Sequence, residues 1–179
     1  MSGSLVLIDS ATATSSDNVI NLGGANWNDS FNVYVLRFNN VGTGTDAKGL
    51  QFRFLDSSNT AISDSTYDVA FTVIKSVDVP EFGYATNGTF GYLIDLRIGT
   101  GNSGDETANG EIYIFNANNA SEHTTYSIES VYLSSDNQMK APYGFGSLTN
   151  TEVVKGVSIF LESNVNFTQG EFKLYGLSN

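Results

Sequence analysis

Short segments in which apolar and polar residues alternate are the feature that most constrains how this chain can fold. Successive side chains of an extended strand point to opposite faces, so such a segment can bury one face and expose the other. In residues 50–54 the apolar side chains occupy every second position, and Gln51 and Arg53 fall on the opposite face. Gly, Asn, Asp and Ser separate these segments, and the frequent β-branched residues disfavour helix. The pattern predicts an all-β protein.

We expect about nine strands, arranged as a two-sheet antiparallel sandwich of the jelly-roll type. Their spacing is irregular and the sequence contains no internal repeat, which argues against a propeller. The expected strands are residues 5–8, 31–38, 50–54, 67–77, 89–98, 111–115, 125–133, 153–161 and 171–177.

The chain divides into a short N-terminal part and one domain. Residues 1–24 are expected to form a first strand followed by a flexible arm, because residues 11–18 have low sequence complexity. Residues 25–179 are expected to form a single β-sandwich domain. A chain of 179 residues can build a core without disulfides, and this one contains no cysteine.

The charge balance excludes some classes of partner. The sequence has 19 acidic and 8 basic residues and a formal net charge of −11. Because binding to phosphate backbones depends on Lys and Arg, we expect no nucleic-acid partner and no binding to anionic membranes. No apolar run is long enough for a transmembrane helix, and residues 1–9 lack the basic region of a signal peptide, so neither membrane insertion nor secretion is expected.

No set of residues predicts an enzyme, a cofactor or a metal site. His123 is the one histidine, and the Gly-x-Ser-x-Gly pattern of serine hydrolases is absent. The distance between paired carboxylates cannot be read from a sequence, so glycoside hydrolysis stays a distant alternative. The long loop predicted at residues 99–110 offers oxygen ligands for calcium without the residue order of a known calcium loop. Whether it binds calcium or is an ordinary solvated loop stays open.

Two aromatic residues are candidates for contacts with a ligand or partner. Trp27, the one tryptophan, lies in a Gly-rich polar segment just before a predicted strand. It is a candidate for sugar stacking, for a subunit contact, or for a lid over the end of the core. Tyr143, like Tyr84, Tyr92 and Tyr113, suits either an interface or a carbohydrate surface.

Three stretches together carry a resemblance to a known group of proteins. Residues 32–41 contain Tyr-x-x-x-Phe-x-Asn-Val, residues 50–70 contain Leu-x-x-Arg-Phe followed by a polar turn and Ser-x-Tyr-Asp-x-Ala, and residues 167–177 read Phe-x-x-Gly-x-Phe-x-Leu-Tyr-Gly-Leu. In this order the chain resembles small jelly-roll-like virion surface proteins of tailed bacteriophages, particularly those of marine bacteria and cyanobacteria. The resemblance implies an oligomeric, non-enzymatic protein on the outside of the virion.

The leading hypothesis is therefore a capsid decoration or head-fibre subunit. It would be made in the host cytoplasm and would bind and stabilise the shell as a homotrimer, through the major capsid protein or other virion proteins. The predicted contacts are Leu5, Val6, Leu7, Ile8 and Trp27. The alternative is a tail-fibre receptor-binding module that recognises host surface glycans through Trp27 and Tyr143, and a carbohydrate-active enzyme is a more distant possibility.

Overall fold

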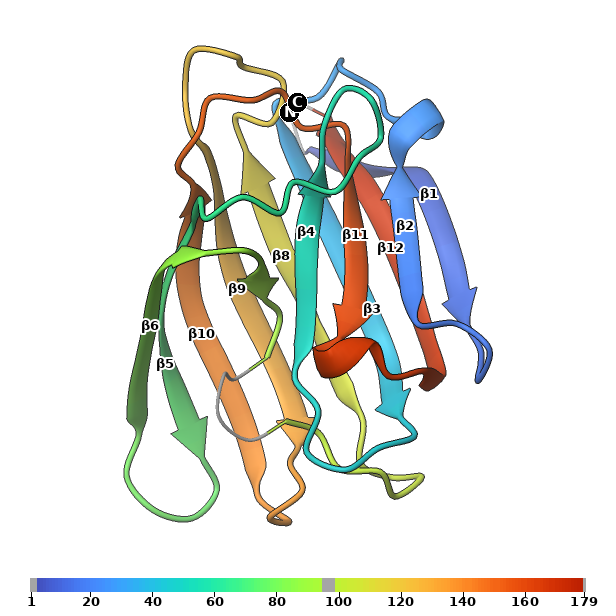
Figure 1. Cartoon of the computed structure of the whole chain (residues 1–179), viewed down its shortest axis with the longest axis vertical. Coiled ribbons are helices and arrows are strands. Elements are labelled where there is room, and N and C mark those ends of the chain that lie inside the picture. Colours follow the sequence, from blue (N-terminus) through green and yellow to red (C-terminus); the bar gives the residue numbers. More distant parts are fainter. Residues whose placement is uncertain (1–2, 95–98, 179) are drawn as a thin grey trace.

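The computed structural model describes residues 3–94 and 99–178 and shows two antiparallel sheets packed face to face (Figure 1). The strands are β1 Ser4–Ala13, β2 Val19–Gly23, β3 Val33–Thr43, β4 Leu50–Leu55, β5 Tyr67–Lys75, β6 Glu81–Gly88, β7 Gly91–Tyr92, β8 Ala108–Phe115, β9 Thr124–Leu133, β10 Met139–Leu148, β11 Gly156–Leu161 and β12 Phe167–Ser178. The large sheet has the order β1-β12-β3-β8-β9-β10-β5-β6, and the small sheet has the order β2-β11-β4-β7. Two single 3-10 turns, η1 Gly24–Asn26 and η2 Glu162–Asn164, are the helical elements of the described chain, and neither is long enough to cross a membrane.

The predicted antiparallel sandwich is confirmed, but the predicted number of strands is wrong. The described residues form 12 strands rather than about nine. The sequence did not reveal β2, β6 and β10. Of the strand predicted at 89–98, the structure contains the two residues of β7, and residues 95–98 lie outside the described part of the chain.

An aromatic cluster fills the space between the sheets. The ring centroid of Phe52 lies 5.1 Å from those of Phe54 and Tyr126, and Phe54 stacks on Tyr67 at 6.1 Å. The Tyr67 hydroxyl donates a hydrogen bond to the Ile62 carbonyl (3.0 Å) and accepts one from the Phe54 N–H (2.9 Å). Burial raises the pKa of Tyr67 and of Tyr126. The polar atom of Tyr67 is thus satisfied within the apolar core.

Glycines on β10 leave room for core side chains of the neighbouring strands. A Cβ atom at Gly146 would lie 2.3 Å from a ring atom of Tyr126, and one at Gly144 would lie 2.5 Å from the Cβ of Phe71. Both positions face the core and must lack a side chain, while the alternate positions carry Tyr143 and Phe145 outward. This inverted pattern, glycine inside and aromatic outside, explains why apolar alternation did not identify the strand.

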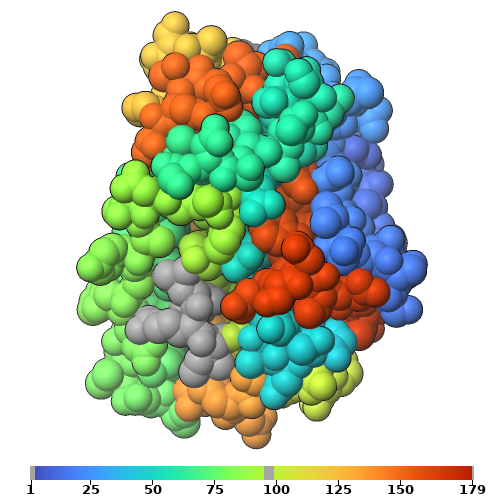
Figure 2. All heavy atoms as spheres, viewed as in Figure 1, coloured from blue at the N-terminus to red at the C-terminus, as the bar shows by residue number. Residues whose placement is uncertain are grey.

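The N-terminal residues join both sheets. β1 pairs with β12 in the large sheet, and β2 pairs with β11 in the small one. Residues 11–13, assigned to a flexible arm from the sequence, belong to β1. In the following turn, the Asp17 carboxylate accepts hydrogen bonds from the Thr14 hydroxyl (2.7 Å) and backbone N–H (2.8 Å), which lowers the pKa of Asp17. Figure 2 shows these first strands along one margin of the molecule, and β5 and β6 along the opposite margin.

Candidate binding face of the large sheet

Large aromatic side chains stand exposed on the outer face of the large sheet. Tyr84 on β6 is 78% exposed, and Tyr143 and Phe145 on β10 are 65% and 67% exposed. The strand between them, β5, contributes the small residue Ala70 opposite both Tyr84 and Phe145. A contiguous exposed patch of this kind usually marks an interaction site. We call this outer surface of β6, β5, β10, β9 and β8 the binding face.

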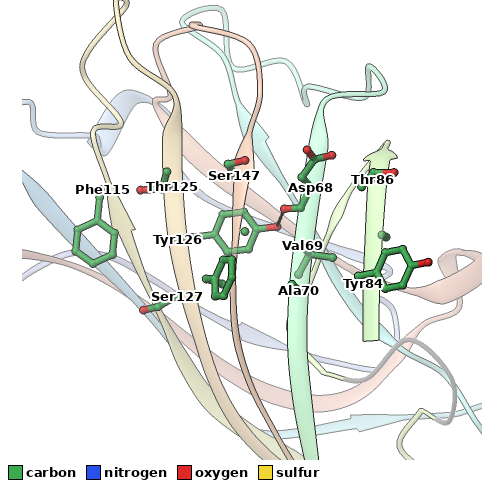
Figure 3. Close-up of a pocket in the computed structure, with 13 residues that line it drawn as sticks. Asp68, Val69, Ala70, Tyr84, Thr86, Phe115, Thr125, Tyr126, Ser127 and Ser147 are labelled. Atoms are coloured by element: carbon green, nitrogen blue, oxygen red, sulfur yellow. Dashed lines mark hydrogen bonds between the residues drawn. The ribbon is translucent and has the colours of Figure 1, made fainter. Parts of the chain in front are cut away.

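The first groove on the binding face has a volume of about 570 Å³. Tyr84 and Phe115 lie at its opposite ends, with Ser127 and Ser147 between them (Figure 3). Asp68 lies at its rim, where one carboxylate oxygen accepts a hydrogen bond from the Asn87 N–H at 2.8 Å. The groove therefore combines aromatic surface with hydroxyl and carboxylate groups, and five different strands supply them.

The second groove, of about 760 Å³, lies along Tyr143 and has a charged wall. Arg37 donates a 2.7 Å hydrogen bond to Glu111, and this bond raises the pKa of Arg37. Glu111 lies directly opposite Glu129 in the pairing of β8 with β9. Residues opposite each other in a sheet have Cβ atoms about 5 Å apart, so the two glutamates are neighbours on the binding face.

Of the two aromatic residues singled out for glycan contact, Tyr143 lies on the binding face and Trp27 does not. The Trp27 ring stacks on Tyr34, with centroids 4.0 Å apart, and its indole N–H donates to Asn118 at 2.9 Å. Trp27 is half-buried against the core, and burial raises the pKa of Tyr34. Trp27 thus has the position of a lid over the end of the core, which was one of the three sequence-based interpretations.

The four N-terminal residues predicted as partner contacts lie in β1, at the end of the strand order. Leu5, Val6 and Leu7 are 37%, 43% and 54% exposed, and Ile8 is half-buried where the register with β12 shifts. β1 has a pairing partner on one side, β12, and the other edge of the strand is open in the described structure. These residues are separated from the binding face by β12 and β3.

The loop predicted at residues 99–110 is shorter than expected because residues 108–110 belong to β8. Thr100 bridges to Lys48 and Ser134, and Glu106 accepts a hydrogen bond from the Ser103 N–H at 2.7 Å. Within residues 3–94 and 99–178, no three acidic, histidine or cysteine side chains gather as a metal site would require. His123 is exposed, with a ring nitrogen 3.4 Å from the Asn150 carbonyl oxygen.

Sequence reasoning did not single out Phe145, and it left Tyr84 ambiguous. The signal for Phe145 was present in the run Tyr143-Gly144-Phe145-Gly146, where aromatic residues and glycines alternate. Such an alternation places rings on one face of a strand and bare backbone on the other. It identifies a strand whose large side chains are not needed for the core.

Comparison with known proteins gives little similarity. No protein-family description matches the sequence, and no curated protein matches it. A fructofuranosidase variant from Schwanniomyces occidentalis, solved with fructosylnystose, is 9% identical with a TM-score of 0.19, over 98% of this chain and 34% of its own. A structure of infectious bursal disease virus, Gt strain, is 8% identical with a TM-score of 0.17, over 94% of this chain and 36% of its own. The chain spans about a third of the length of these two structures, and similarity at this level supports no functional argument.

Proposed function

We propose that this chain is a non-enzymatic surface protein of a tailed-phage virion that recognises host surface glycans through the binding face. The observation that carries the glycan proposal is the exposure of Tyr84, Tyr143 and Phe145 beside grooves lined with hydroxyl and charged groups. The faces of sugar rings are apolar and stack on aromatic side chains, while their hydroxyl groups need hydrogen-bonding partners around the ring. The placement on a virion rests on the three stretches that resemble phage surface proteins.

Retention on an array of purified bacterial surface polysaccharides tests this proposal. Tyr143→Ala and Phe145→Ala remove exposed rings, and each is expected to weaken retention by about tenfold, because exposed aromatic anchors commonly contribute more than 1 kcal/mol to binding. Trp27→Phe is the matched control, because it changes an aromatic residue outside the binding face, and it is expected to retain full binding. Full retention by both binding-face variants would contradict the proposal.

The same array separates binding from catalysis. The retained polysaccharide is incubated with the wild-type protein and analysed for shortened products. An unchanged chain length is the expected result for a binding protein. If the wild-type protein gives shortened products and the Glu129→Gln variant does not, the result would instead support the carbohydrate-active enzyme.

A second candidate function, capsid decoration, is favoured by a different observation. Leu5, Val6 and Leu7 are exposed on the open edge of β1, and an exposed apolar edge strand can pair with a strand of another protein. A subunit that binds only the assembled shell would stabilise the shell by linkage. Immunogold microscopy of phage particles distinguishes the candidates. Many labels over the head indicate decoration, few labels on the tail indicate receptor binding, and unlabelled particles would contradict both virion assignments.

In either role the protein is proposed to act as a homotrimer. Light scattering coupled to gel filtration measures the mass directly, and a trimer would have three times the 19.2 kDa of one chain. A mass equal to that of one chain at all concentrations would exclude the trimer for the isolated protein.

A further inference from the structure

We infer that the glycan recognised by the binding face is a long, linear, extended chain that crosses the strands of the large sheet and continues beyond the binding face over β3 and β12. This inference rests on the proposed function and defines the class of ligand. It comes from one row of side chains that the register of seven strands, from β6 to β12, brings into line.

The row starts at Tyr84 and contains an aromatic residue on every second strand. Tyr84 on β6 lies opposite Ala70, which lies opposite Phe145 on β10. The row continues through Ser127 to Tyr113 on β8. Because directly opposite residues point to the same side of a sheet, all of these side chains belong to the outer face.

The row extends beyond β8 to a fourth ring. Tyr113 lies opposite Val35 on β3, and Val35 lies opposite Tyr175 on β12. Val35 is fully buried although it belongs to the outer face and not to the core cluster, so neighbouring side chains cover it. Tyr113 and Tyr175, its partners in register, are half-buried. At this end of the row, Tyr113 and Tyr175 therefore flank a covered apolar residue.

The spacing of the four rings fits a repeating ligand. Neighbouring strands lie about 4.8 Å apart, so rings on alternate strands are about 10 Å apart and the whole row spans about 29 Å. In an extended β-linked glycan, every second sugar presents the same face, and the distance between these sugars is close to the length of a disaccharide unit. Four rings would thus stack on alternate sugars of a chain of about seven.

Polar groups border much of the row on both sides, in two lines of register partners that also contain Tyr143 and Phe115. On one side, Glu129, Glu111, Arg37 and Lys173 are successive register partners on β9, β8, β3 and β12. On the other side, Asp68, Ser147 and Thr125 are successive partners on β5, β10 and β9. A sugar stacked on a ring directs its equatorial hydroxyl groups sideways, toward these two borders. The arrangement supplies both types of contact that a carbohydrate chain requires.

The charged border distinguishes a glycan from a second copy of this chain. The centres of protein interfaces are depleted of charged residues, and this border carries two acidic and two basic side chains. Arg37 also lies 5.8 Å from the centre of the Tyr175 ring, so the charge reaches into the row itself. A hydrated ligand with many hydroxyl groups accommodates such a border.

Calorimetry with size-fractionated fragments of the polysaccharide retained on the array tests the inference. Affinity is expected to rise from the disaccharide to about the heptasaccharide and then to level off. Tyr84→Ala and Tyr175→Leu change the two ends of the row, and each is expected to lower the affinity for the longest fragments by about five- to tenfold. Leucine at 175 keeps apolar cover over Val35, and circular dichroism checks the fold. Val19→Ala, which changes an exposed residue of β2 in the small sheet, is the control and is expected to bind normally.

The outcomes separate the two proposals. If fragments bind but the disaccharide binds as tightly as the longest chain, the extended ligand is refuted and glycan recognition stands. If the Tyr175→Leu variant is folded and binds long fragments normally, the four-ring row is likewise refuted. If the wild-type protein is retained by no glycan, both proposals fail. If gel filtration shows that the binding-face substitutions dissociate an oligomer instead, the face is an interface between copies.

Discussion

Replacing Trp27 by alanine should destabilise the protein and leave glycan retention intact. The indole stacks on Tyr34 at 4.0 Å and its N–H donates to Asn118 at 2.9 Å. Trp27 has intermediate exposure, and burying about two-thirds of a tryptophan, roughly 150 Å², contributes about 4 kcal/mol at about 25 cal/mol per Å². Ring stacking and the hydrogen bond each add about 1 kcal/mol. Because such terms are not fully additive, we expect the free energy of unfolding to fall by about 3–5 kcal/mol.

Urea denaturation followed by circular dichroism measures this change. Trp27→Phe keeps a ring against Tyr34 and loses the hydrogen bond to Asn118, so it should cost about 1 kcal/mol. Retention on the polysaccharide array is measured in parallel, below the urea concentration at which either variant unfolds. If Trp27→Ala unfolds at the same urea concentration as the wild type but no longer binds glycan, Trp27 is a ligand contact and the lid interpretation is refuted.

Three further predictions concern the core beneath the binding face. Tyr67→Phe removes the hydroxyl that pairs with the Phe54 N–H and the Ile62 carbonyl in the core. Because both groups then lack a buried partner, the free energy of unfolding should fall by about 2–4 kcal/mol in urea titration. A loss below about 0.5 kcal/mol would contradict this account. Burial raises the pKa values of Tyr67 and Tyr126, so the folded chain keeps protons that the unfolded chain releases above the ordinary tyrosine pKa of 10.0. These two groups should therefore leave the stability unchanged below pH 10.0 and lower it as the pH rises above that value. Tyr67→Phe should make this fall in stability shallower in thermal melts at successive pH values, and an equal slope would refute the assignment. Gly146→Ala forces a Cβ to within 2.3 Å of Tyr126 and should cost about 1–3 kcal/mol; Ser147→Ala, on the opposite face of the same strand, is its control and should be nearly neutral.

The sequence predicts the sandwich because most strands bury apolar residues at every second position. This pattern fails where the core position is a glycine. On β10, Gly144 and Gly146 leave room for Phe71 and Tyr126, and on β6 a Cβ at Gly83 would lie 2.5 Å from the Phe71 ring. Side chains of neighbouring strands fill these spaces, so the sequences of β10 and β6 do not themselves show apolar residues at every second position. β2 was missed for another reason, because its five residues bury Ile20 and Leu22 only.

The candidate site is harder to predict because its residues meet through strand order. Phe145 and Tyr113 lie in one row because β9 lies between β10 and β8, and Tyr175 joins them because β12 returns to pair with β3. Each contributing residue has an ordinary surface position in its own strand. An exposed Tyr143 could be suggested from the sequence, but a line of rings requires the register of seven strands. The opposite holds for β1, where Leu5 and Leu7 are conspicuous in the sequence but lie at the edge of the sheet, away from the candidate site.

On β10, glycines occupy core-facing positions and aromatic residues occupy outward-facing positions, and this arrangement links the fold to the proposed function. At Gly144 and Gly146 the core is filled by Phe71 and Tyr126 of the neighbouring strands rather than by side chains of β10. Tyr143 and Phe145 therefore add little to core packing, and their apolar surface stays in water at a free-energy cost that binding would recover. Substitutions at these two positions should accordingly change binding far more than stability. A variant such as Phe145→Ala that unfolds at the wild-type urea concentration while losing glycan would meet this expectation. Equal losses of stability and binding would instead show that the exposed rings support the sheet itself.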